Sequence, residues 1–505
     1  MKRNKIILLL CLSFFIQNAN ARENIKELFK NNQAIIYTIN IRNFGSTDKD
    51  NDGIINPEKG DVRGSFLNAK KNLKKLSDDG INTIYVLPIT PVGKYKALGT
   101  AGSLYAMDSF NKINPQIDDI NPMKATDEAK LFTKKAHELN MNVILDLPSC
   151  GSYDLSLKKP DWFMFDENGE SLTPADWTDV RLFKIYNEDK TLNEEMLNNF
   201  KSFVDMAINL GFDGIRADVA AIKPYEFWKN IIDYAKSKNP DFYFLAEANP
   251  EWDNPAVNGV KNYATIDSLL KAGFDSYYGS FSDFKNIKTK KEFDKKITTN
   301  LKILQKHKNK SIIGAFATHD QQAPVLRGEN YWRMVLWLNV TLPLNSYFLD
   351  GFSVGDDFTY DYENEKAKNS LTDDEFYYVH SGMADIFNMT ASVRKLHPDF
   401  EQEYKKAISF KNNNKDFFKY AKYKTLKTGN NRVFAYSMTY SNKKIVVVAS
   451  LDEDNIQKTS LYENWLNKDY DFEILNGKSS LKIEKSKMNI ALEPLEIQVY
   501  SIKTK

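Results

Sequence analysis

Three acidic residues follow predicted β-strands in strongly patterned segments. Asp218 ends the segment GFDGIRAD, Glu247 ends FLAE, and Asp320 ends FATHD. Arg216 lies two residues before Asp218, so both side chains point to the same face of an extended strand. Retaining glycoside hydrolysis needs such a set, because a nucleophilic carboxylate must lie about 5 Å from a protonated carboxylic acid. Arg216 would keep Asp218 ionised, and neighbouring carboxylates would raise the pKa of Glu247.

A scaffold that brings these strand ends together is predicted by the alternation of strands and helices. Eight strand–helix units with mostly short loops are typical of a parallel (β/α)8 TIM barrel, whose chemistry lies at the carboxyl ends of the strands. We expect the barrel over residues 22–400, with an inserted subdomain at 148–187 and a long helix at 375–396. The predicted strands are 34–43, 81–88, 142–147, 211–219, 242–247, 274–278, 311–318 and 344–348.

The pattern changes from about residue 401. Short apolar or alternating runs at 434–440, 443–450, 470–475 and 495–502 are separated by Asn, Gly and Lys turns. Such runs indicate strands. The sequence therefore predicts a C-terminal all-β sandwich domain over residues 401–505.

Composition excludes several classes of protein. The 505 residues carry 69 Lys+Arg against 67 Asp+Glu, and 42% are hydrophobic. These values exclude global disorder, and the near-neutral charge gives no general attraction to nucleic acid. After the first 21 residues, no stretch has the length of a membrane span.

The first 21 residues have the pattern of a secretory signal peptide. Lys2, Arg3 and Lys5 precede an apolar stretch at 7–15, and Ala19-Asn20-Ala21 forms a small-residue cleavage site. We expect export to the periplasm or the medium and no membrane attachment after cleavage; an uncleaved anchor is the alternative. Lipid attachment at Cys11 is disfavoured because Leu10 precedes it. Cleavage would leave Cys150 as the remaining cysteine, so no intramolecular disulfide could form.

Three motifs carry a resemblance to a known family. GFDGIRADVA, FLAEANP and FATHDQ resemble the catalytic regions of the α-amylase family of glycoside hydrolases. The resemblance covers essentially the whole chain after residue 21 and implies an oligo- or polysaccharide substrate. It also implies roles for individual residues: Asp218 as nucleophile, Glu247 as general acid/base, Asp320 as transition-state stabiliser, Arg216 and His319 as sugar contacts in the cleavage subsite, and Tyr105 as the ring that stacks on that sugar.

Alternatives remain open at this point. The same carboxylates serve hydrolysis of α-glucans or α-gluco-oligosaccharides and glycosyl transfer to another sugar, so the motifs do not separate these two activities. A catalytically inactive glucan-binding protein would be expected to have lost the acids. The acids could also form only salt bridges or caps at strand ends, although three in such settings disfavour this.

The segment after the third strand departs from the family pattern. It reads Asp146-Leu-Pro-Ser-Cys150-Gly151, with Cys150 and Gly151 where the family usually has Asn and His. The usual calcium ligand and a sugar contact would then be missing. We expect a roomier cleavage subsite, weak acarbose-like inhibition and a Gly151→His variant that binds such inhibitors better. Cys150 could be a reactive thiol, but a spectator role is favoured because no His partner is evident.

A second site is suggested by an Asp-rich segment. Asp48, Asp50 and Asp52 alternate with other residues before Gly53, as in calcium loops, and Lys59 occupies the twelfth position, so the segment is not an EF-hand. It resembles the calcium loop that follows the first strand in some oligosaccharide-cleaving relatives. A structural Ca2+ is predicted here, with no organic cofactor; a solvated turn is the alternative. The expected ligand residues are Asp48, Asp50, Asp52, Ile54 and Asp61.

Overall fold

The structure is a computed structural model. It describes residues 22–97, 101–118, 123–174, 178–253, 256–257, 260–321, 323–356, 397–467, 469–477, 482–484 and 486–504. The predicted signal peptide at 1–21 and the predicted helix at 375–396 lie outside these residues. In the described part of the chain, no helix is both long enough and apolar enough to cross a membrane.

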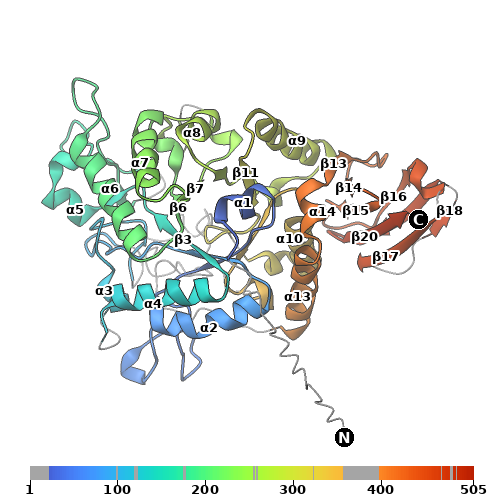
Figure 1. The fold of residues 1–505 in the computed structure, drawn as a ribbon, viewed down its shortest axis with the longest axis horizontal. Coiled ribbons are helices and arrows are strands. Elements are labelled where there is room, and N and C mark those ends of the chain that lie inside the picture. Colours follow the sequence, from blue (N-terminus) through green and yellow to red (C-terminus); the bar gives the residue numbers. More distant parts are fainter. Residues whose placement is uncertain are drawn as a thin grey trace, which may run out of the picture.

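Eight parallel strands close into a barrel at the centre of the molecule (Figure 1). The eight predicted strands and the barrel fold are therefore confirmed. Continuous apolar runs form these strands because each strand is buried both by the barrel interior and by the surrounding helices. In order along the chain the strands are β1 (Ile35–Ile39), β2 (Thr83–Val86), β3 (Asn142–Leu147), β6 (Gly214–Ala217), β7 (Tyr243–Ala246), β10 (Ser276–Tyr277), β11 (Ser311–Gly314) and β12 (Asn345–Leu349).

Amphipathic helices surround the barrel and bury their apolar faces against it. Polar side chains fix several of their first turns: Ser65 caps α2, Asn193 caps α6, and Thr289 forms a capping box with Glu292 at α9. The surrounding helices are α2 (Phe66–Asp78), α4 (Ala125–Glu138), α6 (Glu194–Asn209), α7 (Tyr225–Lys238), α8 (Ile266–Ala272), α9 (Lys290–Lys306), α10 (Glu329–Thr341) and α13 (Pro398–Asn412), while α1 (Ile25–Lys30) precedes β1.

The segment between β3 and α6 forms the inserted subdomain. It contains β4 (Gly151–Ser152), α5 (Tyr153–Lys158) and β5 (Val180–Arg181), and β4 pairs antiparallel with β5. Its core is aromatic: the rings of Phe163 and Phe183 lie 4.9 Å apart, and Phe183 contacts Phe110 at 5.4 Å. This aromatic core joins the subdomain to the barrel.

The all-β region begins at Lys422, later than the expected residue 401, because α13 and α14 (Lys415–Tyr420) occupy the intervening residues. Buried Lys411 of α13 donates to the Leu344 carbonyl at 2.9 Å and to Ser346 Oγ at 2.8 Å, which ties α13 to the barrel. The strands are β13 (Lys422–Thr425), β14 (Val433–Tyr440), β15 (Lys443–Ser450), β16 (Gln457–Tyr462), β17 (Tyr470–Asn476), β18 (Lys482–Glu484), β19 (Lys487–Leu492) and β20 (Ile497–Thr504).

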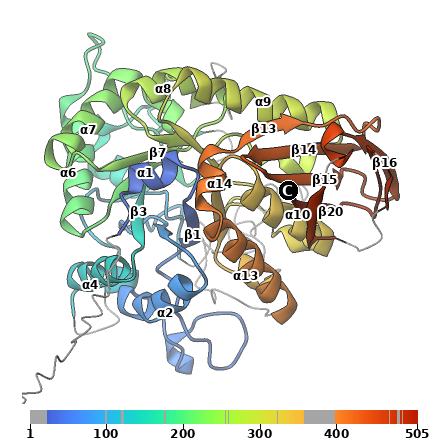
Figure 2. The same cartoon turned by 45° about the vertical axis from the view of Figure 1, so that its right-hand side comes forward.

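These strands form a five-stranded antiparallel sheet, ordered β13-β14-β15-β20-β17, and a three-stranded sheet, ordered β16-β19-β18. One face of the larger sheet packs on the smaller one. Its other face continues the barrel core, and Phe293 of α9 stacks on Phe434 of β14 with ring centroids 3.8 Å apart. The sheet therefore lies directly against the barrel helices (Figure 2).

Candidate active site

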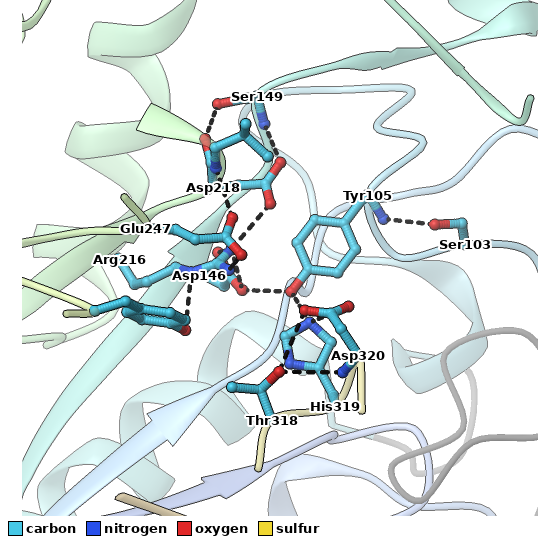
Figure 3. Close-up of polar contacts among 12 residues, drawn as sticks. Ser103, Tyr105, Asp146, Ser149, Arg216, Asp218, Glu247, Thr318, His319 and Asp320 are labelled. Carbon is cyan, nitrogen blue, oxygen red and sulfur yellow. Dashed lines mark hydrogen bonds and ion pairs between the residues drawn. The ribbon is translucent and has the colours of Figure 1, made fainter. Parts of the chain in front are cut away.

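The three predicted acids meet at the carboxyl end of the barrel (Figure 3). Asp218 is the first residue after β6, Glu247 is the first after β7, and Asp320 lies in the loop after β11. Arg216 is in β6 and pairs with Asp146 of β3 in the parallel ladder. We call Asp146, Arg216, Asp218, Glu247 and Asp320 the rim site.

Arg216 is the centre of the rim site and is fully buried. Its Nη1 lies 2.9 Å from Asp146 Oδ1 and 3.0 Å from Asp218 Oδ1, and its Nη2 lies 2.9 Å from Glu247 Oε1. Its Nε donates to the Tyr278 hydroxyl at 3.2 Å. A buried guanidinium fork of this kind holds several carboxylates in fixed directions and offsets part of their charge.

Of the three carboxyls that contact Arg216, those of Asp218 and Glu247 have raised pKa values. Burial is the main cause at both, and it raises the pKa of Asp218 to about 6, although Arg216 acts in the opposite direction. Burial raises the pKa of Glu247 well above its usual range, and the charges of Asp218 and Asp320 raise it further. Arg216 therefore acts in the expected direction, although desolvation outweighs its ion pair. Of the two carboxyls, Glu247 is therefore the one that keeps its proton to higher pH.

Tyr105 and His319 close one side of the site. The Tyr105 hydroxyl donates to Asp146 Oδ2 at 2.7 Å and lies 2.7 Å from His319 Nε2, while the two rings stack at 5.5 Å. Because that hydroxyl gives its proton to Asp146, His319 Nε2 must be the donor to the hydroxyl oxygen. His319 is then the neutral Nε2–H form, in agreement with a pKa that burial lowers.

Asp320 is the least enclosed of the acids. Its side chain is 37% exposed, and the hydroxyl of Thr318 accepts a hydrogen bond from its main-chain N–H at 3.2 Å. His319 Nε2 lies 3.5 Å from Asp320 Oδ1. Asp320 thus faces the other acids from the opposite side of the site (Figure 3).

The residue after Asp218 links it to Glu247. Val219 has φ 36° and ψ 54°, a left-handed conformation that costs energy for a β-branched residue. In this conformation its N–H donates to Glu247 Oε2 at 2.7 Å. The strained conformation of Val219 therefore directs its main-chain N–H toward the Glu247 carboxylate.

Gly151 does not leave the space that the sequence suggested. A Cβ at this position would lie 2.6 Å from Phe163 Cζ and 2.8 Å from Phe183 Cε1. It would therefore point into the aromatic core of the inserted subdomain. The structure does not support the prediction that Gly151→His would bind acarbose-like inhibitors better, because two phenylalanine rings fill the volume that the new side chain would need.

Cys150 lies next to the site but is not a nucleophile. It is 1% exposed, and burial raises the pKa of its thiol to about 12. A thiol of this kind stays protonated and unreactive. It packs in an apolar cluster with Ala106, Val180, Val219 and Ile222, so the spectator interpretation is supported.

Sequence reasoning missed two residues beside Asp218: Ser149 and Lys223. The main-chain N–H of Ser149 donates to Asp218 Oδ2 at 3.1 Å, and its hydroxyl donates to the Asp218 carbonyl. Lys223 is buried and donates from Nζ to the Ser149 carbonyl at 2.7 Å. The sequence could have indicated Lys223, which follows four apolar residues and lies five residues after Asp218. A lysine buried in such a run needs a hydrogen-bond partner nearby.

The segment 48–61, here called the Asp loop, is separate from the rim site. Carboxylate oxygens of Asp48, Asp50 and Asp61 lie within 4.8 Å of one another. Asp52 is outside this group, and its carboxylate contacts the Lys59 ammonium, which also lies 3.0 Å from Asp50. Ile54 is 55% exposed, and its N–H donates to Asp52 Oδ1 at 2.8 Å. The donor set suits a hard cation, but Lys59 competes for two members of the expected set.

Solved structures of α-amylases share this fold. An α-amylase from Lactobacillus plantarum superposes with a TM-score of 0.66 at 18% identity, covering 94% of this chain and 99% of that one. A noncanonic maltogenic α-amylase from Thermotoga neapolitana gives a TM-score of 0.64 at 21% identity, with the same coverage of both chains. At these identities the likeness establishes the fold.

Sequence comparison gives a partial match. No protein-family model matches the chain. An α-1,4-glucan:maltose-1-phosphate maltosyltransferase of Bifidobacterium animalis subsp. lactis is 29% identical over 217 residues, which are 40% of this chain and 29% of that protein. The chain therefore matches less than a third of that relative's length. The resemblance to α-amylases is therefore confirmed at the level of the fold by the solved structures, and the sequence match to the maltosyltransferase covers part of the chain.

Proposed function

We propose that this protein is a retaining enzyme of the α-amylase family that acts on α-glucans or α-gluco-oligosaccharides. The observation that carries the proposal is the Arg216 fork, which holds Asp218 and Glu247 side by side. A short separation of two carboxyls is the arrangement of retaining glycosidases.

In the first step, Asp218 attacks the anomeric carbon of the sugar while Glu247 donates its proton to the departing glycosidic oxygen. The C–O bond to the leaving group breaks, and an ester bond to Asp218 forms. The raised pKa of Glu247 keeps the proton available for this step. Asp320 stabilises the positive charge that develops on the sugar ring.

In the second step, Glu247 takes a proton from the incoming hydroxyl, which attacks the anomeric carbon and releases Asp218. Water as acceptor gives hydrolysis, and a sugar hydroxyl gives transfer. The partial sequence match to a maltosyltransferase favours transfer to an α-glucan as the second candidate activity. A glucan-binding protein without activity is disfavoured by the intact acids.

One experiment separates these activities. The protein would be incubated with maltose, maltoheptaose, isomaltose and starch, and products would be followed by chromatography and proton NMR. Retention predicts that the α-anomer appears first from an α-linked substrate. Products longer than the substrate indicate transfer. A β-anomer as the first product would overturn the assignment of Asp218 as nucleophile.

Export and calcium binding are further proposals. We propose that residues 1–21 direct export, which N-terminal sequencing of the protein from the medium or the periplasm would test. We also propose that Asp48, Asp50 and Asp61 would hold a structural Ca2+; the proximity of their carboxylates supports this. Asp52 would join them only if it left Lys59.

A further inference from the structure

A buried lysine beside the nucleophile takes no part in the steps above. Lys223 is 1% exposed and lies just after the short helix that follows Asp218. Its ammonium donates to the Ser149 carbonyl at 2.7 Å and lies 5.1 Å from the ring centroid of Phe200. It forms no ion pair with a carboxylate in the described part of the chain. Burying a lysine in this way is costly, so a role at its location is expected.

Ser149 connects this lysine to the nucleophile. Its N–H donates to Asp218 Oδ2 at 3.1 Å, and its hydroxyl donates to the main-chain carbonyl of Asp218. Ser149 therefore holds both the carboxylate and the backbone of Asp218. The other carboxylate oxygen, Oδ1, is held by Arg216 at 3.0 Å.

We propose that Lys223 is a positioning residue for the nucleophile and acts through Ser149. By fixing the Ser149 carbonyl, Lys223 keeps the Ser149 N–H directed at Asp218 Oδ2 and so fixes the rotation of the carboxylate. A nucleophile held this way attacks in one orientation. This should raise the rate, because a small displacement of a reacting group slows the reaction strongly. This inference rests on the proposed role of Asp218.

Charge adds to geometry at this position. Burial lowers the pKa of Lys223 to about 8, while the negative charge of Asp218 raises it, so its ammonium and the Asp218 carboxylate attract each other. The Ser149 N–H lowers the pKa of Asp218 and so favours the ionised carboxylate. The titratable and charged groups that face Asp218 are Asp146, Arg216, Glu247, Asp320, Lys223, Cys150 and Tyr105.

The test is the pH profile of kcat/KM for Lys223→Met and Lys223→Arg. Lys223→Met removes both the ammonium and the support of Ser149, so kcat should fall about 10- to 100-fold while KM changes little. The acid limb, which reports ionisation of the nucleophile in the free enzyme, should move upward by on the order of one pH unit. Lys223→Arg should lower kcat less than Lys223→Met and should shift the acid limb by a smaller amount, because it keeps a charged donor.

Lys411 provides a matched control, since it is also buried and also bonds carbonyl oxygens, but at the opposite end of the barrel strands. Lys411→Met should lower the melting temperature without moving the acid limb. Should Lys223→Met fail to fold, Lys223→Gln is to be measured, and it should move the limb upward by a smaller amount.

The outcomes distinguish the two proposals. An active wild type whose acid limb is the same in all Lys223 variants would overturn the positioning role alone. A wild type that processes no α-glucoside, although it is folded, would overturn the proposed function itself.

Discussion

The rim site and the Asp loop each gather acidic side chains, but in opposite surroundings. At the rim site, Asp218 and Glu247 are each 7% exposed, and burial raises their pKa values. In the Asp loop, Lys59 and the N–H of Ile54 lower the pKa of Asp52, and the N–H groups of Lys49 and Asn56 lower that of Asp61. Enclosure prepares a carboxyl to carry a proton, whereas amide donors keep it as an anion. The first arrangement suits acid–base chemistry, and the second suits cation binding.

The largest effect should come from the acids of the rim site. Asp218→Asn and Glu247→Gln should each lower kcat by at least about 10³-fold, because each removes one partner of the double displacement. The melting temperature should change little, since both amides keep the shape and some hydrogen bonds. Initial rates on maltoheptaose would be compared with unfolding curves. As a control, Asp52→Asn in the Asp loop should keep the normal rate, and near-normal turnover in either rim variant would place the chemistry elsewhere.

Removing the cation should destabilise the two regions to different extents. Arg216→Met leaves buried carboxyls without their guanidinium and should reduce the free energy of unfolding by about 3–5 kcal/mol. Lys59→Met removes a cation that is 47% exposed and should produce no resolvable loss. Urea unfolding at pH 7 measures both. Equal losses of unfolding free energy in the two variants would show that burial of the charged groups does not distinguish the two regions.

Calcium should affect only the Asp loop. If Asp48, Asp50 and Asp61 bind the ion, calcium at 100-fold above its Kd should stabilise the protein by about 2.7 kcal/mol, and a chelator should remove this gain. Asp50→Ala should abolish the response. Asp52→Ala should preserve it, because Asp52 lies outside the cluster. An identical melting curve with calcium and with chelator would leave the Asp loop as a polar turn.

The smallest expected effect is the pH dependence of stability. Groups with raised pKa bind protons more tightly when folded, so their stabilisation is complete below pH 4 and is lost as pH rises through the folded pKa. Burial raises the pKa of Asp179 to about 6 and of Asp350 to about 7, as it does for Asp218. The melting temperature should therefore fall by a few degrees, roughly, between pH 5 and 7.

Above pH 7 this trend should weaken, because burial lowers the pKa of Lys411 to about 7 and of Lys223 to about 8. A lysine that loses its proton more easily when folded stabilises the protein as pH rises. Asp218→Asn should flatten the slope between pH 5 and 7. A melting temperature that rises over this interval would contradict the assigned cause.

Much of the fold could be predicted because barrel strands are buried on both faces and appear as short apolar runs between helices. The acids followed from the same pattern, since residues just after parallel strands meet at one end of a barrel. The boundary at 401 failed because helices α13 and α14 precede the all-β region, and Pro398 begins the first of them.

Other features of the site depend on contacts between distant segments. Phe163 and Phe183 lie 12 and 32 residues after Gly151, so the sequence alone could not show that they fill the space beside it. The Ser149–Lys223 contact spans 74 residues. The raised pKa of Asp218 was not predicted for a related reason: a neighbouring arginine is visible in the sequence, but the degree of burial is not.

The continuous core beneath the C-terminal sheet has a practical consequence for anyone who shortens this chain. Phe434 and Tyr436 of β14 pack on Phe293 of α9, and the Tyr436 hydroxyl lies 2.7 Å from that of Thr341 at the end of α10. A truncation before Lys422 would uncover this apolar surface on two barrel helices, and exposed surfaces of this kind promote aggregation. The sheet is therefore not an exchangeable module, and shortened or fused versions of this protein should retain it whole.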